Sequence, residues 1–143
     1  MKPLPRLLKA SLDPGSRDVL VVEDDHDLST LMEMIVVEAG YEVRRATNGA
    51  EGLARVAERM PGLILLDMRM PVMNGWEFAR SFRSRYGRAA PIVVITAAEN
   101  ARGRAEEISA ESFLEKPFEL EDVIVTVARF LGPPRAHKTS AQI

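Results

Sequence analysis

Cysteine is absent from the 143-residue sequence, and tryptophan occurs only once. The lack of cysteine excludes disulfide bonds, thiolate zinc sites and cysteine nucleophiles. Long hydrophobic runs are also missing, because no apolar stretch approaches the roughly 20 residues that a membrane-spanning helix needs. The apolar pair Leu7-Leu8 near the start is too short for a secretion signal. We therefore expect a cytoplasmic protein with no membrane partner.

An excess of basic residues is lacking as well, since 19 basic side chains stand against 21 acidic ones. Such an excess is typical of proteins that bind nucleic acids, so no direct nucleic-acid partner is expected. The acidic residues are concentrated in the centre, where residues 19–131 carry 13 basic and 19 acidic side chains. An acidic body favours a cation site over a surface for phosphate backbones.

The length suits a single domain flanked by two tails. Hydrophobic residues make up 46% of the sequence, which is enough for a core. Residues 1–17 and 132–143 mix proline with polar residues and show no periodicity, so we expect flexible tails. The folded domain is expected to span residues 18–131. No helix-turn-helix pattern follows it, and we expect a stand-alone protein.

Short apolar runs alternate with amphipathic patterns between the tails. The runs of strand character are VLVV at 19–22, YEVRRA at 41–46, LILL at 63–66, IVVI at 92–95 and SFLE at 112–115. A helical pattern follows each run, the later ones lying at 49–60, 76–86, 101–108 and 119–131. Because parallel strands need helical crossovers, five β–α pairs predict a doubly wound α/β fold with a five-stranded parallel sheet.

The helical patterns also predict which side chains face the core. The first stripe comprises Leu28, Leu31, Met32, Ile35 and Val36. The second comprises Leu53, Val56, Ala57 and Met60. Of the two acids Asp25 and Asp27, Asp27 is the better candidate for the N-cap of the first helix.

Chemically active side chains stand at the ends of four strands. Glu23 and Asp24 follow the first strand, Asp67 the third, Thr96 the fourth and Lys116 the fifth. The carboxyl ends of parallel strands form the edge at which such sheets bind ligands. Carboxylates suit Mg²⁺, a lysine and a hydroxyl suit phosphoryl oxygens, and a carboxylate can act as a nucleophile.

Each of these residues has an ordinary interpretation when it is taken alone. Glu23 and Asp24 could form a solvated turn, and Asp67 could be a turn residue at a strand end. Thr96 could be a β-branched strand residue, and Lys116 belongs to a common Lys-Pro pair. Their shared placement at strand ends favours a site that binds a cation and a phosphoryl group.

Four segments in this order resemble the receiver domain of two-component response regulators. They are VLVVEDD, LILLDMRMPVMNGWE, VVITA and FLEKPF. The resemblance covers about residues 18–131. It implies the flavodoxin-like (βα)5 receiver fold with strand order 2-1-3-4-5.

The resemblance also implies a role for each matching residue. Asp67 would accept a phosphoryl group from a phosphohistidine on a sensor histidine kinase or a histidine phosphotransfer protein. Asp24, Glu23, Asp67 and the backbone carbonyl of Arg69 would hold Mg²⁺. Thr96 and Lys116 would bond the phosphoryl oxygens.

The switch and the output are implied in the same way. Phe113 would be the aromatic that turns inward when Thr96 moves, and Pro117 would follow a cis peptide bond. The output partner, a protein of unknown identity, would bind around the fourth helix, the fifth strand and the fifth helix. Such a protein is a phosphoacceptor that catalyses its own modification, and not an enzyme in the metabolic sense.

Three other functions remain as alternatives. A pseudo-receiver would bind partners without phosphorylation. A phosphatase of the haloacid-dehalogenase type would use Asp67 as nucleophile but would want a second Asp where Arg69 stands. A flavin-binding domain of similar topology would want a Gly/Ser/Thr-rich loop after the first strand, where this chain has acids.

Two features depart from the receiver pattern. The segment between Thr96 and Lys116 is about two residues shorter than usual, so we expect a short, displaced or partly unwound fourth helix. Arg69 is long and cationic, and our hypothesis is that it lies over the acyl phosphate and obstructs the attacking water. The basic run Arg80, Arg83, Arg85 and Arg88 is expected to be a solvated helix face.

Overall fold

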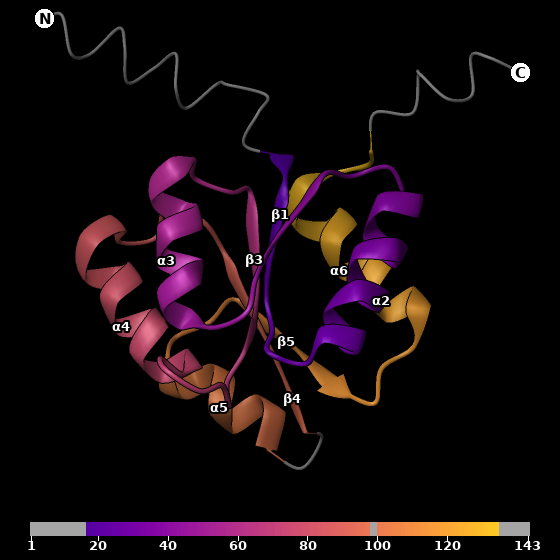
Figure 1. Cartoon of the computed structure of the whole chain (residues 1–143). Coiled ribbons are helices and arrows are strands. Elements are labelled where there is room, and N and C mark those ends of the chain that lie inside the picture. The colour runs from indigo at the N-terminus through magenta and orange to yellow at the C-terminus, as the bar shows by residue number, and fades with distance from the viewer. Residues whose placement is uncertain (1–16, 98–99, 135–143) are drawn as a thin grey trace, which may run out of the picture.

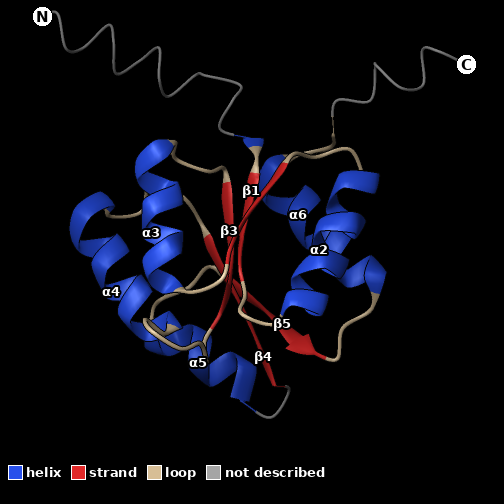
Figure 2. Cartoon of the chain, in the orientation of Figure 1, coloured by secondary structure: helices blue, strands red, loops and turns tan. Residues whose placement is uncertain are grey.

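The computed structural model describes residues 17–97 and 100–134, and most of the two expected tails lies outside the described residues. A central sheet lies between two layers of helices (Figures 1 and 2). The strands are β1 (Val19–Val22), β2 (Val43–Ala46), β3 (Leu63–Asp67), β4 (Ile92–Ala97) and β5 (Ser112–Lys116). The helices are α2 (His26–Glu38), α3 (Gly49–Glu58), α4 (Gly75–Tyr86), α5 (Ala101–Glu107) and α6 (Leu120–Leu131).

The sheet has the order β2-β1-β3-β4-β5, and every neighbouring pair is parallel. This confirms the predicted doubly wound α/β fold with strand order 2-1-3-4-5. Strand β1 lies next to both β2 and β3, so the chain reverses its direction of winding there. Ligands bind such sheets beyond the carboxyl ends of the strands at this reversal.

Alternate residues of the buried strands enter two separate cores. Leu20 and Val22 pack with side chains of α3 and α4, whereas Val19 and Val21 pack with side chains of α2 and α6. All four residues of β1 are fully buried. Helices on both faces therefore explain why the strand is apolar throughout instead of alternating.

Several side chains lie differently from the helical-stripe prediction. Leu31 is 48% exposed and Ala57 is exposed, so neither belongs to the core. The pattern of residues 76–86 predicts one apolar face made of Trp76, Ala79, Phe82 and Tyr86, but Phe78, which lies outside that face, is fully buried. Apolar residues spaced three and four apart indicate which face of a helix is buried, but they do not define the edges of that face. The neighbouring elements decide which residues at those edges are covered.

The N-cap of α2 is Asp25, and the prediction of Asp27 is wrong. The Oδ1 of Asp25 accepts a hydrogen bond from the backbone N–H of Leu28 at 3.0 Å. Asp27 lies two residues further along, among the helical residues of the first turn. An acidic residue is favourable there because of the partial positive charge at a helix N-terminus.

A buried ion pair ties β1 to β2 and α3. Asp18 is 1% exposed, and its Oδ2 lies 2.6 Å from the Nε of Arg44. The same arginine donates to the carbonyl oxygens of Arg55 and Arg59 at 2.9 and 2.7 Å. The carbonyl oxygen of Arg55 also accepts from the backbone N–H of Arg59 at 3.2 Å, so Arg44 adds a second donor at the end of α3.

Helix α5 has seven residues, which confirms the expectation of a short helix in this segment. Within residues 17–97 and 100–134, no helix is long and apolar enough to cross a membrane.

Candidate functional site

The predicted site residues come together at one edge of the sheet. Glu23 and Asp24 directly follow β1, and Asp67 is the last residue of β3. The parallel register pairs Asp67 with Ile95, the neighbour of Thr96, and pairs Lys116 with Ala97. Strand β3 therefore lies between the acids of β1 and the hydroxyl and ammonium groups of β4 and β5.

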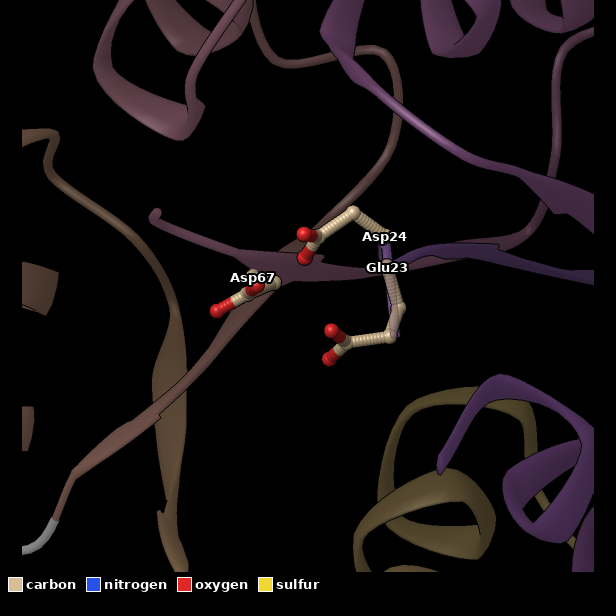
Figure 3. A group of neighbouring side chains, drawn as sticks. All are labelled: Glu23, Asp24 and Asp67. Atoms are coloured by element: carbon tan, nitrogen blue, oxygen red, sulfur yellow. The ribbon is translucent and has the colours of Figure 1, made fainter. Parts of the chain in front are cut away.

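The three carboxylates form one cluster. Glu23, Asp24 and Asp67 each offer an oxygen within 4.8 Å of the others, and Figure 3 shows all three side chains pointing into the same space. Glu23 and Asp67 are only 1% and 5% exposed, whereas Asp24 lies at the surface. Buried carboxylates this close repel one another, so the site favours a positive charge between them.

Lys116 supplies one such charge. Its Nζ lies 3.6 Å from Oδ1 of Asp67 and 3.5 Å from Oε1 of Glu23. The peptide bond between Lys116 and Pro117 is cis, as the resemblance implies. The Oε1 of Glu23 is buried and accepts no hydrogen bond from a described residue, so one cation does not complete the site.

The electrostatics follow from this burial. Desolvation raises the pKa of Glu23 to about 7, and the negative charge of Asp67 adds to the increase. Burial also raises the pKa of Asp67, although the positive charge of Lys116 opposes the increase. Both carboxylates are thus held in surroundings that disfavour their charged forms unless a cation is bound.

The loop after Asp67 is fixed by a close backbone contact. The N–H of Gly75 donates to the carbonyl oxygen of Met68 at 2.9 Å. A Cβ at Gly75 would lie 2.7 Å from the Cα of Met68, which no side chain can occupy. Asn74 and Glu77 form a reciprocal capping box that starts α4 at this point.

Thr96 and Phe113 occupy different parts of the site. Thr96 is 7% exposed in β4, near the acidic edge. Phe113 is partly buried in β5 and packs against the core beside α5. The guanidinium of Arg102 lies over its ring, 5.3 Å from the ring centre.

The side chain of Arg69 contacts Trp76. Its guanidinium carbon lies 6.0 Å from the centre of the indole ring. The Nε1 of Trp76 donates to Glu107 at 2.7 Å, so the indole joins the loop after Asp67 to α5. No motif in the sequence pointed to this contact of Trp76. Whether Arg69 shields the acyl phosphate stays a prediction.

Known proteins resemble this chain in both sequence and fold. The response regulator receiver domain family matches residues 19–128. The transcriptional regulatory protein PrrA of Mycobacterium leprae is 34% identical over 134 residues, which cover 91% of this chain and 57% of the relative. PcoR of Escherichia coli, also named a transcriptional regulatory protein, is 29% identical over 120 residues, covering 82% of this chain and 53% of the relative.

The chain spans about half the length of the curated relatives it matches. Because two of them are named transcriptional regulators, the expectation that no nucleic acid is involved finds no support among the relatives.

Two solved structures have the same architecture. The receiver domain of NtrX from Brucella abortus has a TM-score of 0.73 at 29% identity, covering 80% of this chain and 98% of the other. The chemotaxis protein CheY4 of Vibrio cholerae has a TM-score of 0.72 at 31% identity, with the same coverage. With the family match over residues 19–128, these similarities show that the chain belongs to the response regulator receiver domain family.

Proposed function

We propose that Asp67 accepts a phosphoryl group from a phosphohistidine on a sensor histidine kinase or a histidine phosphotransfer protein. The observation that carries this proposal is the position of Asp67, a buried carboxylate between an acidic cluster and the Nζ of Lys116. A carboxylate that only ended a strand would not need two further acids and an ammonium group beside it.

The residues present fit a magnesium ion. Receiver domains bind Mg²⁺ at an acidic pocket, and hard oxygen ligands are what this ion prefers. Asp24 and Asp67 would hold it through carboxylate oxygens, with Glu23 and the backbone carbonyl of Arg69 completing the set. The buried Oε1 of Glu23 has no described hydrogen-bond donor, as expected of an oxygen reserved for a cation or its water. When bound, Mg²⁺ would neutralise charge on the carboxylates and on the transferring phosphoryl group.

The residues of the chain then divide the work of phosphoryl transfer. An oxygen of Asp67 forms a bond to phosphorus while the bond from phosphorus to the donor imidazole breaks, and that electron pair returns to the imidazole nitrogen. Lys116 donates to one phosphoryl oxygen, and the hydroxyl of Thr96 donates to another. Positioning and charge stabilisation account for most of the acceleration in such transfers.

The modified site would signal through Thr96 and Phe113. Movement of Thr96 toward the phosphoryl group makes room for Phe113 to turn inward, which changes the surface around α5, β5 and α6. Phosphate contacts thereby shift the population between two conformations. The output partner is a cytoplasmic protein of unknown identity. The chain acts as a signalling protein that catalyses its own phosphorylation, with no metabolic substrate.

One observation favours the pseudo-receiver as a second candidate. Helix α5 has only seven residues and lies in the segment that would report phosphorylation. A receiver in which this segment no longer changed on phosphorylation could bind its partner constitutively. Partner binding that is identical for the wild type and for Asp67→Asn would favour this candidate.

The test is the intact mass of the protein after incubation with Mg²⁺ and a small acyl-phosphate donor. We expect a gain of one phosphoryl group, and no gain when Mg²⁺ is chelated. Asp67→Asn should not gain mass, whereas Asp27→Asn, which alters an exposed acid in the first turn of α2, should behave like the wild type. An unmodified wild-type protein that is folded would refute the phosphoacceptor proposal.

A further inference from the structure

A second site lies between α4 and α5, apart from the acidic cluster. It is a cavity of about 350 Å³, and its polar walls include Trp76, Arg80, Arg83, Arg88, Glu107 and Ser109. None of the residues at the acidic edge of the sheet lines it. A volume of this size suits a small ligand.

The walls of this cavity are basic although the body of the protein is acidic. Three arginines line it, and Glu107 is the one acid among the described lining residues. Glu107 is already engaged, because it accepts from Trp76 at 2.7 Å and from the Nη2 of Arg104 at 3.0 Å. The negative charge inside the cavity is therefore compensated, while the arginines leave an excess of positive charge.

Two of the arginines converge on a single acceptor. The Nη2 of Arg83 and the Nη1 of Arg88 donate to the carbonyl oxygen of Ser109 at 2.9 and 3.2 Å. Ser109 has a φ of 54°, a left-handed conformation that is uncommon for a residue other than glycine. Guanidinium groups this close repel each other, and Glu111 supplies one opposing charge, at 2.6 Å from Arg88 and 3.5 Å from Arg83.

The arginines also keep donors that the described protein does not use. The Nε of Arg83 is buried and donates to no acceptor among the described residues. Arg80 is exposed, and no hydrogen bond or ion pair joins it to the described part of the chain. Unused guanidinium donors are costly when buried and suit an oxyanion when they are gathered in one place.

We propose that the α4–α5 cavity binds a small ligand through a phosphate group, with Arg80, Arg83 and Arg88 as donors. Arg80 and Arg83 lie three residues apart on α4, and Arg83 and Arg88 converge on one carbonyl oxygen, so three guanidinium groups are gathered at this cavity. Guanidinium groups bind phosphate oxygens through charge-assisted hydrogen bonds, and a phosphate offers three such groups more oxygens than a carboxylate does. The phosphate could be free or could belong to a nucleotide, since the same donors recognise both. This site does not depend on phosphorylation of Asp67.

Trp76 makes the proposal directly testable. It is the only tryptophan of the chain and lies at the cavity wall, so its fluorescence should respond to a bound ligand. The probes are pyrophosphate, inorganic phosphate, AMP and citrate, added to the 143-residue protein at constant ionic strength. Chelation of Mg²⁺ in all samples separates this site from the acidic cluster.

The variants form a matched pair on one helix. Arg80→Glu reverses a charge in the cavity, whereas Arg85→Glu makes the same change at an exposed position of α4 that does not line it. We expect saturable binding of a phosphate-bearing probe, weakened about tenfold or more by Arg80→Glu and about twofold or less by Arg85→Glu. Neither arginine pairs with a described side chain, so neither exchange breaks an ion pair within the described residues. Arg85 lies in the last turn of α4, where an acidic side chain is unfavourable, so Arg85→Glu should unfold at a slightly lower temperature than the wild type.

The probes separate the possible sources of the phosphate. Binding of AMP without inorganic phosphate or pyrophosphate would support a nucleotide, and binding of pyrophosphate alone would support a free phosphate compound. Equal binding of citrate, equal losses in the two variants, or no saturable binding of any probe would overturn the proposal. Ligand-induced amide shifts at residues 107–109 would place the binding in this cavity, whereas shifts confined to the acidic edge would contradict it.

Discussion

The Nζ of Lys116 lies 3.6 Å from the Oδ1 of Asp67, so the fifth strand places a cation against the carboxylate that ends the third. The distance is longer than a hydrogen bond, which leaves the ammonium group free to turn toward a phosphoryl oxygen. The same Nζ lies 3.5 Å from Glu23, and one positive charge therefore serves two buried acids.

Removal of this ammonium group should slow phosphorylation. For Lys116→Ala, we expect the rate of phosphorylation by a small acyl-phosphate donor to fall about 100-fold, because loss of one preorganised donor to a developing charge typically costs this much. The initial rate of mass increase measures the effect. Glu115→Gln changes an exposed neighbour in β5 and should leave the rate within about twofold of the wild type. An unchanged rate in Lys116→Ala would show that the lysine takes no part.

The metal-free protein should lose stability as the pH rises through the neutral range. Folded Glu23 keeps its proton up to about pH 7, whereas the ordinary pKa is 4.5, so between these values the folded state binds more protons than the unfolded state. The free energy of unfolding then falls with increasing pH, by about 3 kcal/mol over this interval. Urea unfolding with chelator at pH 5, 6 and 7.5 measures the fall.

Glu23→Gln is the control for this pH dependence. It removes the titrating group but keeps the shape of the side chain, so the variant should be the more stable protein at pH 7.5 and should lack this part of the slope. Parallel profiles for the wild type and the variant would contradict the raised pKa of Glu23.

Gly75 should tolerate no side chain, because a Cβ would lie 2.7 Å from the Cα of Met68. Gly75→Ala is expected to destabilise the protein by about 2 kcal/mol and to slow phosphorylation, since the displaced segment adjoins Asp67. The matched control is Gly103→Ala in α5, where a Cβ would meet nothing within 4 Å. In a helix interior this exchange should be neutral or stabilising, by up to about 1 kcal/mol. Equal effects of the two substitutions on stability would contradict the close contact.

Asp18→Ala should destabilise the fold by about 3 kcal/mol, because it leaves Arg44 half-buried without its carboxylate partner. Chemical denaturation measures the loss. Glu58→Ala breaks the exposed pair with Arg55 and should cost less than about 1 kcal/mol. A loss of stability below about 1 kcal/mol for Asp18→Ala would contradict this prediction, because it would mean that water solvates the guanidinium group of Arg44 once the carboxylate is removed.

The sequence predicts much of the acidic edge for a simple physical reason. Strand ends are marked by the change from apolar to polar residues, and parallel strands bring their carboxyl ends together. Glu23, Asp24 and Asp67 could therefore be placed in one cluster before any coordinates were known. The fold followed from the same alternation of strand and helix patterns.

Contacts between distant segments could not be predicted in this way. The pairing of Asp18 with Arg44 depends on how β2 lies against β1, and no local pattern around Arg44 identifies its partner. The α4–α5 cavity could not be predicted either. Arg83 and Arg88 meet there because both donate to the carbonyl oxygen of Ser109, which lies 26 and 21 residues away in the sequence. A periodic pattern identifies a face of a helix but not what the face meets.

Mapping of the modified residue tests the phosphoacceptor proposal most directly. Borohydride reduces an aspartyl phosphate to homoserine, and tandem mass spectrometry of the peptide around residue 67 then locates it after treatment with Mg²⁺ and an acyl-phosphate donor. We expect homoserine at position 67 alone, and none without Mg²⁺. Homoserine at Asp24 or Asp25, or unmodified Asp67 in a folded protein, would contradict the proposal that Asp67 is the phosphoacceptor.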